Sequence, residues 1–179
     1  MKNIRMSGFL PVGLLLLLTA SAASADSGKP NKLKTKLSGF LEVPVSISTA
    51  GHGEFRATIN ESETVISYEL EYADLEGGTV LFAHVHIGQR ATAGGVMFFL
   101  CGGGGKPACP SSGKVTGTVV AADIIGPAGQ GISAGQLAEA IRAMRAGAAY
   151  ANVHTATYPT GEIRGQIRNG GSEHNDNDK

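Results

Sequence analysis

The stretch from Thr79 to Gly88 reads TVLFAHVHIG, and the expected fold follows from it. Successive side chains of a β-strand point to opposite faces of the sheet. His84 and His86 therefore share one face, while Ala83 and Val85 share the other. The stretch predicts a strand that has an apolar side and a side with two imidazoles.

A second segment, from Tyr150 to Arg168, repeats the alternation in the sequence YANVHTATYPTGEIRGQIR. The residues expected to face inward are Ala151, Val153, Ile163, Gly165 and Ile167. The residues expected to face outward are Asn152, His154, Glu162, Arg164 and Gln166. If the two segments lie in one sheet, three histidines, a carboxylate and a guanidinium meet on a single face.

The rest of the chain is also dominated by short runs with strand periodicity. They are Lys32–Ser38, Gly53–Ile59, Thr64–Tyr72, Gly94–Leu100 and Gly113–Val120. Turns rich in Gly, Pro and Asp separate them, and no helical pattern lies between them. This arrangement predicts an all-β fold, an antiparallel β-sandwich or barrel.

One short helix is expected near the C-terminal third of the chain, from Ala134 to Ala146. Ser133 is the expected N-cap, and Gly147 can adopt the left-handed conformation that ends a helix. Leu137, Ile141 and Met144 fall on one stripe, so the helix is expected to cover one end of the sheet structure.

The first residues have the pattern of a secretory signal peptide. Lys2 and Arg5 precede an apolar run at Phe9–Leu18, and Ala23–Ala25 has the small-x-small form of a cleavage site. The run is shorter than the roughly 20 residues that span a bilayer. The expected organisation is a signal peptide at 1–25, a lead-in at 26–31, one domain at 32–168 and a disordered polar tail at 169–179.

The charge balance argues against several classes of partner. The chain has 15 basic and 15 acidic residues. Removal of the leader takes away two of the basic residues and leaves a net charge of −2 (13 basic against 15 acidic). The protein therefore lacks the basic surface that nucleic acid or an anionic membrane would need. We expect a secreted or periplasmic protein without a membrane span.

The two cysteines, Cys101 and Cys109, bracket the flexible loop CGGGGKPAC. In an oxidising compartment this spacing favours a local disulfide. A two-thiolate metal site is the alternative, although seven intervening residues match no standard short zinc spacing. Asn60 begins an Asn-Glu-Ser acceptor pattern for N-glycosylation, which matters only in a eukaryotic secretory pathway.

The histidines are the main candidates for chemistry. Neutral imidazole suits copper and zinc, and His84 and His86 could present two nitrogens to one ion. His154 would be a third ligand and His52 a fourth. The alternative is a structural network in which the three strand histidines bond to Asn152, Glu162 and Arg164. The positive charge of Arg164 would oppose a bound cation unless Glu162 neutralises it.

The residues do not indicate catalysis. Ser67 lies within a predicted strand without an adjacent base, and the cysteines are expected to be oxidised. His84 with Glu162 could serve acid-base chemistry, but no companion nucleophile is apparent. We expect a non-enzyme that requires no cofactor. Copper or zinc binding, with metal-dependent redox activity, is the alternative.

Four sequence blocks resemble the CHRD (chordin) domain over Leu33 to Ile167. They are LSGFLEVPV, TAGHGEF, AHVHIG and AGAAYANVHTATYPTGEIRGQI. The last contains Gly-x-x-Tyr-x-Asn-x-His-Thr and Gly-Glu-Ile-Arg-Gly patterns that are similar to those of the family. The resemblance implies a secreted β-sandwich-like module, found singly in many bacterial proteins. It is also repeated in chordin beside cysteine-rich growth-factor-binding modules, which are absent here.

A more local similarity concerns copper-zinc superoxide dismutase, whose copper site also uses a His-x-His strand in a β-sandwich. The block HVHIG resembles that strand, but the sequence has no separate His-rich zinc loop. Two functions therefore stay open. One is a non-catalytic extracellular module that contacts another protein or matrix component, and the other is an exported metal-binding protein that uses the three histidines.

Overall fold

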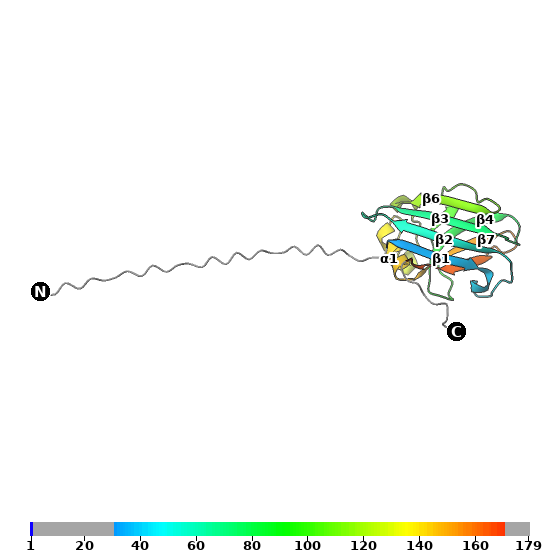
Figure 1. Ribbon diagram of the computed structural model, residues 1–179, viewed down its shortest axis with the longest axis horizontal. Coiled ribbons are helices and arrows are strands. Elements are labelled where there is room, and N and C mark those ends of the chain that lie inside the picture. The colour runs from blue at the N-terminus through cyan, green and yellow to red at the C-terminus, as the bar shows by residue number, and fades with distance from the viewer. Residues whose placement is uncertain (2–30, 171–179) are drawn as a thin grey trace.

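A computed structural model describes Met1 and residues 31–170 of the chain. Nine strands form in this part (Figure 1). They are β1 (Lys32–Ser38), β2 (His52–Ile59), β3 (Ile66–Ala73), β4 (Val80–Ile87), β5 (Val96–Cys101), β6 (Gly113–Val119), β7 (Ala149–Thr155), β8 (Ile163–Gln166) and β9 (Arg168–Asn169). The strands expected before residue 121 agree with these within two residues at each end. The predicted all-β class is confirmed.

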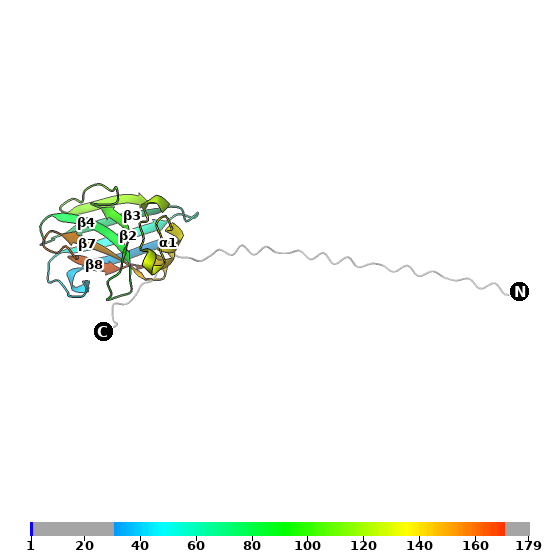
Figure 2. The same ribbon diagram turned by 180° about the vertical axis from the view of Figure 1, so that it is seen from behind.

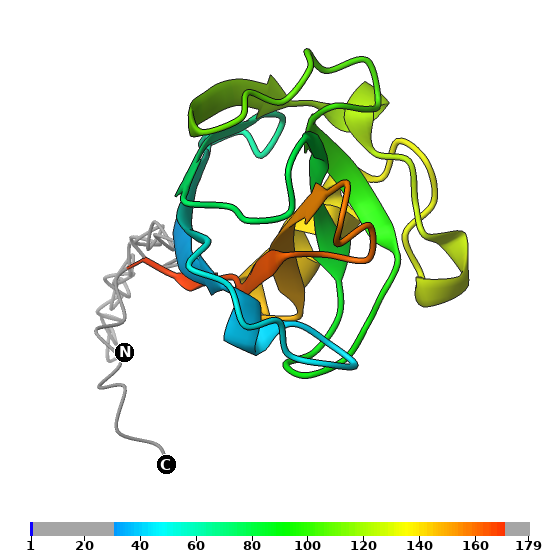
Figure 3. The ribbon, with the colours of Figure 1, turned by 90° about the vertical axis from the view of Figure 1, so that its right-hand side faces the viewer.

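All strand pairs are antiparallel, in the order β5-β4-β7-β8-β1-β2-β3-β6, and β9 pairs with β1. The sheet curls until its two outer strands, β5 and β6, approach each other. Figure 3 looks along the resulting ring of strands. Of the two predicted architectures, sandwich and barrel, the structure is a nearly closed barrel.

The barrel interior holds the apolar side of each strand, as β3 illustrates. Its residues Ile66, Tyr68, Leu70 and Tyr72 are buried and alternate with more exposed positions. The Tyr68 hydroxyl donates a hydrogen bond to the carbonyl of Leu100 at 2.7 Å, so this buried phenol has a partner. Strand periodicity in the sequence therefore corresponds directly to the core.

The helix α1 (Leu137–Arg145) covers one end of the barrel (Figure 2). It starts three residues later than expected because Gly135, with φ of 83°, has a left-handed backbone. The expected cap at Ser133 is therefore wrong. Gln136 is the N-cap and makes no capping bond with its side chain. The expected end is confirmed, since Gly147 has φ of 69°.

The C-terminal segment is not one continuous strand. It divides into β7, a turn, β8 and β9. The expected start of the tail at residue 169 is too early, because Asn169 pairs with Leu33 and the Gly170 amide donates to the carbonyl of Lys32 at 2.7 Å. The predicted signal peptide, the lead-in before Asn31 and residues 171–179 lie outside the described residues.

The remaining described elements are three short 3-10 helices and a disulfide. The helices are η1 (Gly39–Leu41), η2 (Ala121–Asp123) and η3 (Ala128–Gln130). The expected disulfide joins Cys101 to Cys109, with an S–S distance of 2.00 Å. It ties the end of β5 to the loop that precedes β6. None of the described helices is long and apolar enough to cross a membrane.

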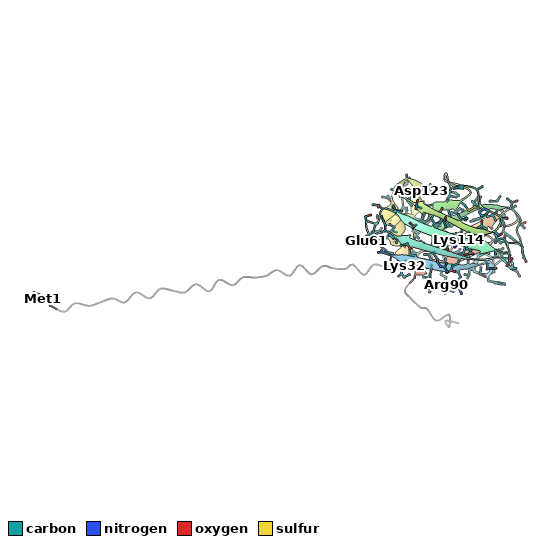
Figure 4. The ribbon with its side chains drawn as sticks, turned by 45° about the horizontal axis from the view of Figure 1, so that its top comes forward. Met1, Lys32, Glu61, Arg90, Lys114 and Asp123 are labelled. Atoms are coloured by element: carbon teal, nitrogen blue, oxygen red, sulfur yellow. A yellow bond between two sulfur atoms is a disulfide. The ribbon has the colours of Figure 1, made fainter. Side chains whose placement is uncertain are left out.

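Charged side chains of both signs lie over the outside of the barrel, as the labelled Glu61, Lys114 and Asp123 show in Figure 4. Several of them pair with neighbours of opposite sign. Lys114 contacts Glu69 at 3.0 Å, and Lys106 contacts Asp123 at 2.9 Å. This mixed distribution agrees with the near-neutral charge of the sequence.

Candidate metal site

Three buried histidines come together on the outer face of the barrel wall, where β4 lies beside β7 (Figure 2). His84 and His86 lie on β4 and His154 on β7. In the β4–β7 register, Asn152 is opposite His84, which sets His154 diagonally across from His84. The intervening residues of both strands point into the core, so alternation aims all three imidazoles outward.

The imidazoles are close enough to share one ion. Their candidate ligand nitrogens all lie within 4.8 Å of one another. The ring centroid of His84 is 4.4 Å from that of His86 and 4.4 Å from that of His154. The exposed fractions of His84, His86 and His154 are 4%, 8% and 5%, although they face away from the core. Loops folded over the barrel wall account for this burial.

Backbone carbonyls of two such loops orient two of the rings. His86 Nδ1 donates to Gly94 O at 2.9 Å, and His154 Nδ1 donates to Pro159 O at 3.0 Å. A carbonyl oxygen only accepts, so the ring proton is on Nδ1 and Nε2 carries a free lone pair. Both Nε2 atoms are buried and have no hydrogen-bond partner in the part of the chain that the structure describes. The same holds for Nδ1 of His84.

All three rings are neutral at physiological pH. Burial, together with the neighbouring imidazoles of His154 and His86, lowers the pKa of His84 to about 2. Burial also lowers the pKa of His86 and that of His154 to about 4 each. The three unpartnered nitrogens are therefore available as electron-pair donors without prior loss of a proton.

Aromatic side chains form one wall of the cluster. Phe82 stacks on His84 with ring centroids 5.2 Å apart and lies 4.9 Å from the ring of His154. The ring of Phe99 in β5 is nearly perpendicular to that of His84, also with 5.2 Å between the centroids. These rings keep water away from His84, which agrees with its strongly lowered pKa.

A polar and charged wall lies on the opposite side. The ring of Tyr150 is parallel to that of His86, at 4.5 Å between centroids. Arg164 of β8 lies over the same phenol ring, 3.6 Å from its centroid. Asn152 lies between His84 and Arg164 on the sheet face, since it pairs with His84 on one side and with Arg164 on the other. Asn152 and Arg164 are each 3% exposed.

The sequence did not single out Glu42, which the segment between β1 and β2 brings beside Asn152 and Arg164. Its side chain is 5% exposed, and burial raises its pKa to about 7 against the opposing charge of Arg164. Its Oε1 atom has no partner among the described residues. In the sequence, the only indication that Glu42 is buried near the site was its position as an acidic residue within the apolar stretch FLEVPV.

The hydrogen bonds of Glu162 are made away from the histidines. This residue precedes β8, so strand alternation does not control its direction. Its carboxylate is fully buried and accepts four hydrogen bonds. The donors are Thr49 Oγ1 (2.8 Å), Thr155 Oγ1 (2.8 Å), Glu76 N (2.7 Å) and Gly77 N (3.0 Å). Glu162 therefore ties the segments beside β2, β4, β7 and β8 together at one end of the barrel.

His52 also lies apart from the three clustered histidines. It begins β2, which is separated from β7 by β8 and β1 in the strand order. Its side chain is exposed, and Nδ1 bonds to the carbonyl of Ala50 at 3.1 Å. Sequence alternation could not reveal this separation, because it depends on which strands are neighbours.

Comparison with known proteins places the chain in a family. The family model described as CHRD domain matches residues 33–167. The searches of curated proteins and of solved structures gave no match. The matched range contains strands β1 to β8 apart from the first residue of β1, and it ends directly before β9. The chain is a member of the CHRD domain family.

Proposed function

We propose that this CHRD-domain protein is an exported, non-catalytic module that binds one copper or zinc ion through His84, His86 and His154. The observation that carries the proposal is a cluster of three buried histidines, each with an imidazole nitrogen that has no hydrogen-bond partner among the described residues. Buried polar atoms are almost always paired, so three unpaired nitrogens in one cluster need an explanation. A shared metal ion satisfies all three at once.

The orientation of the rings supports metal binding over a purely structural network. Metal-binding histidines usually donate the second ring N–H to a carbonyl, which fixes the tautomer and ring direction. His86 and His154 do this toward Gly94 and Pro159. A structural network would pair the remaining ring nitrogens with donors, whereas His84 Nδ1, His86 Nε2 and His154 Nε2 have no donor within residues 31–170. Three histidine ligands with a free fourth position are an established set for zinc, and imidazole also suits copper.

Export and a non-catalytic role have separate support. The Cys101–Cys109 disulfide is typical of proteins in oxidising compartments and agrees with the signal peptide expected at residues 1–25. Because both cysteines are oxidised, neither offers a thiolate nucleophile.

The experiment uses untagged protein, loaded separately with copper and zinc and then desalted. Elemental analysis should give about one metal ion per chain, the stoichiometry of a single three-ligand site. The His84→Ala, His86→Ala double variant should lose it. His52→Ala is the matched control, since His52 is exposed and separate from the cluster, and it should keep the full stoichiometry. Wild type without metal, or equal metal in the double variant, would overturn the proposal. Superoxide turnover by the loaded protein would overturn the non-catalytic assignment.

A second candidate function, contact with an extracellular protein or matrix component, has one observation in its favour. Phe40 and Val45 are each 66% exposed, on the same β1–β2 segment that carries the buried Glu42. Apolar side chains gathered on one exposed segment are typical of contact surfaces. The Phe40→Ser, Val45→Ser variant should keep the wild-type melting temperature and metal content but lose retention on the extracellular material of the host. Unchanged retention would remove this candidate.

A further inference from the structure

Arg164, Tyr150 and His86 form a continuous stack across three neighbouring strands. The rings of Tyr150 and His86 are parallel within 6°. Because β7 lies between β4 and β8, the imidazole and the guanidinium approach the phenol from opposite sides. Arg164 is held in place by a hydrogen bond from Nη1 to Thr92 O at 3.1 Å. The stack thus holds a fixed positive charge behind one of the proposed ligands.

The charge of Arg164 acts on the histidine cluster. Burial is the main cause of the lowered pKa of His86, and the positive charge of Arg164 lowers it further. The Arg164 guanidinium carbon is at most 8.1 Å from the His86 ring centroid, which is the total of the 3.6 Å and 4.5 Å separations in the stack. Glu42 is the acidic group beside Arg164, but with a pKa of about 7 it is largely uncharged at pH 6.

We propose that Arg164, through its stack on Tyr150, makes the three-histidine site select monovalent copper over divalent ions. This inference rests on the proposed metal-binding function. Three neutral imidazoles contribute no negative charge, so a bound ion keeps its full charge inside a buried site. The repulsion from Arg164 grows in proportion to that charge, and the cost of burial grows with its square. Monovalent copper also needs no fourth ligand from the protein.

The size of the effect follows from Coulomb's law. A bound ion would lie about 3 Å from the His86 centroid, in the plane of the ring and so across the stack, which puts it about 9 Å from Arg164. At this distance and an effective dielectric constant of about 20, one unit charge weakens the binding of a monovalent cation about 20-fold. A divalent cation loses twice the free energy, which is about 400-fold in affinity. Removal of the Arg164 charge should therefore shift the ratio of the two affinities by about 20-fold. Loss of a merely structural side chain would weaken both ions alike.

The experiment compares Cu(I) with Zn(II), two ions of the same d¹⁰ configuration that differ mainly in charge. Affinities are measured at pH 6.0 by competition with chromophoric chelators, under argon for Cu(I). Wild type should bind Cu(I) more tightly than Zn(II). Arg164→Gln should strengthen Zn(II) binding at least tenfold more than Cu(I) binding. Arg164→Lys, which keeps the charge, should retain the wild-type ratio. Arg56→Gln is the matched control, since Arg56 is exposed on β2, and it should change neither affinity.

The possible negative results test the selectivity proposal and the metal site separately. If Zn(II) binds as tightly as Cu(I), or if Arg164→Gln changes both affinities equally, the selectivity proposal is overturned while the metal site stands. If neither ion binds, the proposed function falls and this inference falls with it. Should Arg164→Gln not fold, Glu42→Gln provides the test at pH 8, where the wild-type carboxylate offsets Arg164. Loss of that negative charge should weaken Zn(II) binding more than Cu(I) binding, and an unchanged ratio would refute the proposal.

Discussion

The phenol ring of Tyr150 lies parallel to the imidazole of His86, with 4.5 Å between the ring centroids. Gly94 holds both residues, because its carbonyl accepts a hydrogen bond from His86 Nδ1 and its amide donates one to the Tyr150 hydroxyl at 3.1 Å. One backbone unit of the β4–β5 loop therefore sets the direction of a proposed ligand and of the aromatic ring behind it. The geometry of the site depends on this loop as much as on the strands.

The first prediction concerns this loop. A Cβ atom at Gly94 would collide with the carbonyl oxygen of Ile87, so Gly94→Ala must displace the loop and its bond to His86. We expect metal affinity to fall about 10- to 100-fold, as for lost outer-shell partners of metal-binding histidines. Gly129→Ala is the matched control, since open space surrounds the new Cβ there. Equal metal affinity in the two variants, measured by chelator competition, would show that Gly94 does not position His86.

The second prediction is a steep loss of stability in acid. In the unfolded chain, the three histidines gain protons as pH falls through 6.5. In the folded protein they stay neutral to lower pH, because the pKa is about 4 for His86 and His154 and about 2 for His84. Their contribution is complete above pH 6.5 and is lost as pH falls. The free energy of unfolding of the metal-free protein should decrease by about 1.4 kcal/mol per pH unit for each histidine. Glu42 has a folded pKa of about 7, above the ordinary value of a carboxyl, so it takes up its proton earlier in the folded protein and offsets about one histidine's share.

Urea denaturation at intervals from pH 7.5 to pH 4.5, with chelator present, measures this slope. His154→Gln should reduce it by about one histidine's share, near 1.4 kcal/mol per pH unit. A slope that is identical in wild type and variant would mean that His154 titrates alike in the folded and unfolded chains.

The third prediction separates Glu162 from the metal site. Glu162→Gln replaces one acceptor oxygen with an NH₂ group that faces hydrogen-bond donors, so we expect the protein to lose about 2–4 kcal/mol of stability. The metal stoichiometry of the folded variant should stay at the wild-type value. The control is Glu61→Gln, an exposed carboxylate in the β2–β3 turn, which should change stability by less than about 0.5 kcal/mol. Loss of metal from folded Glu162→Gln protein would instead link Glu162 to the site.

The fourth prediction concerns the disulfide. Cys101 and Cys109 are eight residues apart, and closure of so small a loop contributes about 2–3 kcal/mol in the chain-entropy description. The Cys101→Ala, Cys109→Ala double variant should therefore unfold at lower urea concentration while it keeps its metal. Wild type treated with a phosphine reductant should match it. An unchanged unfolding midpoint in both samples would show that the bond adds nothing to stability.

The amino-acid sequence by itself determined the β-strands and their buried sides. Alternation in contiguous residues is a local property, so the ranges of β1 to β6 and the shared face of His84 and His86 could be predicted from it. The start of α1 could not, because Gly135 takes a left-handed conformation where the sequence suggested a first turn. The spacing of Cys101 and Cys109 was equally local, and their disulfide forms as expected.

Only the tertiary structure decided which strands are neighbours and where the loops run. Pairing of β4 with β7, distant in sequence, brings His154 to the other two histidines, while β1 and β8 separate them from His52. Glu42 reaches the site and Glu162 makes its bonds elsewhere because both lie outside strands, where no periodicity controls direction. Neighbour choice and loop path depend on long-range packing and chain closure, and no local pattern of residues encodes them.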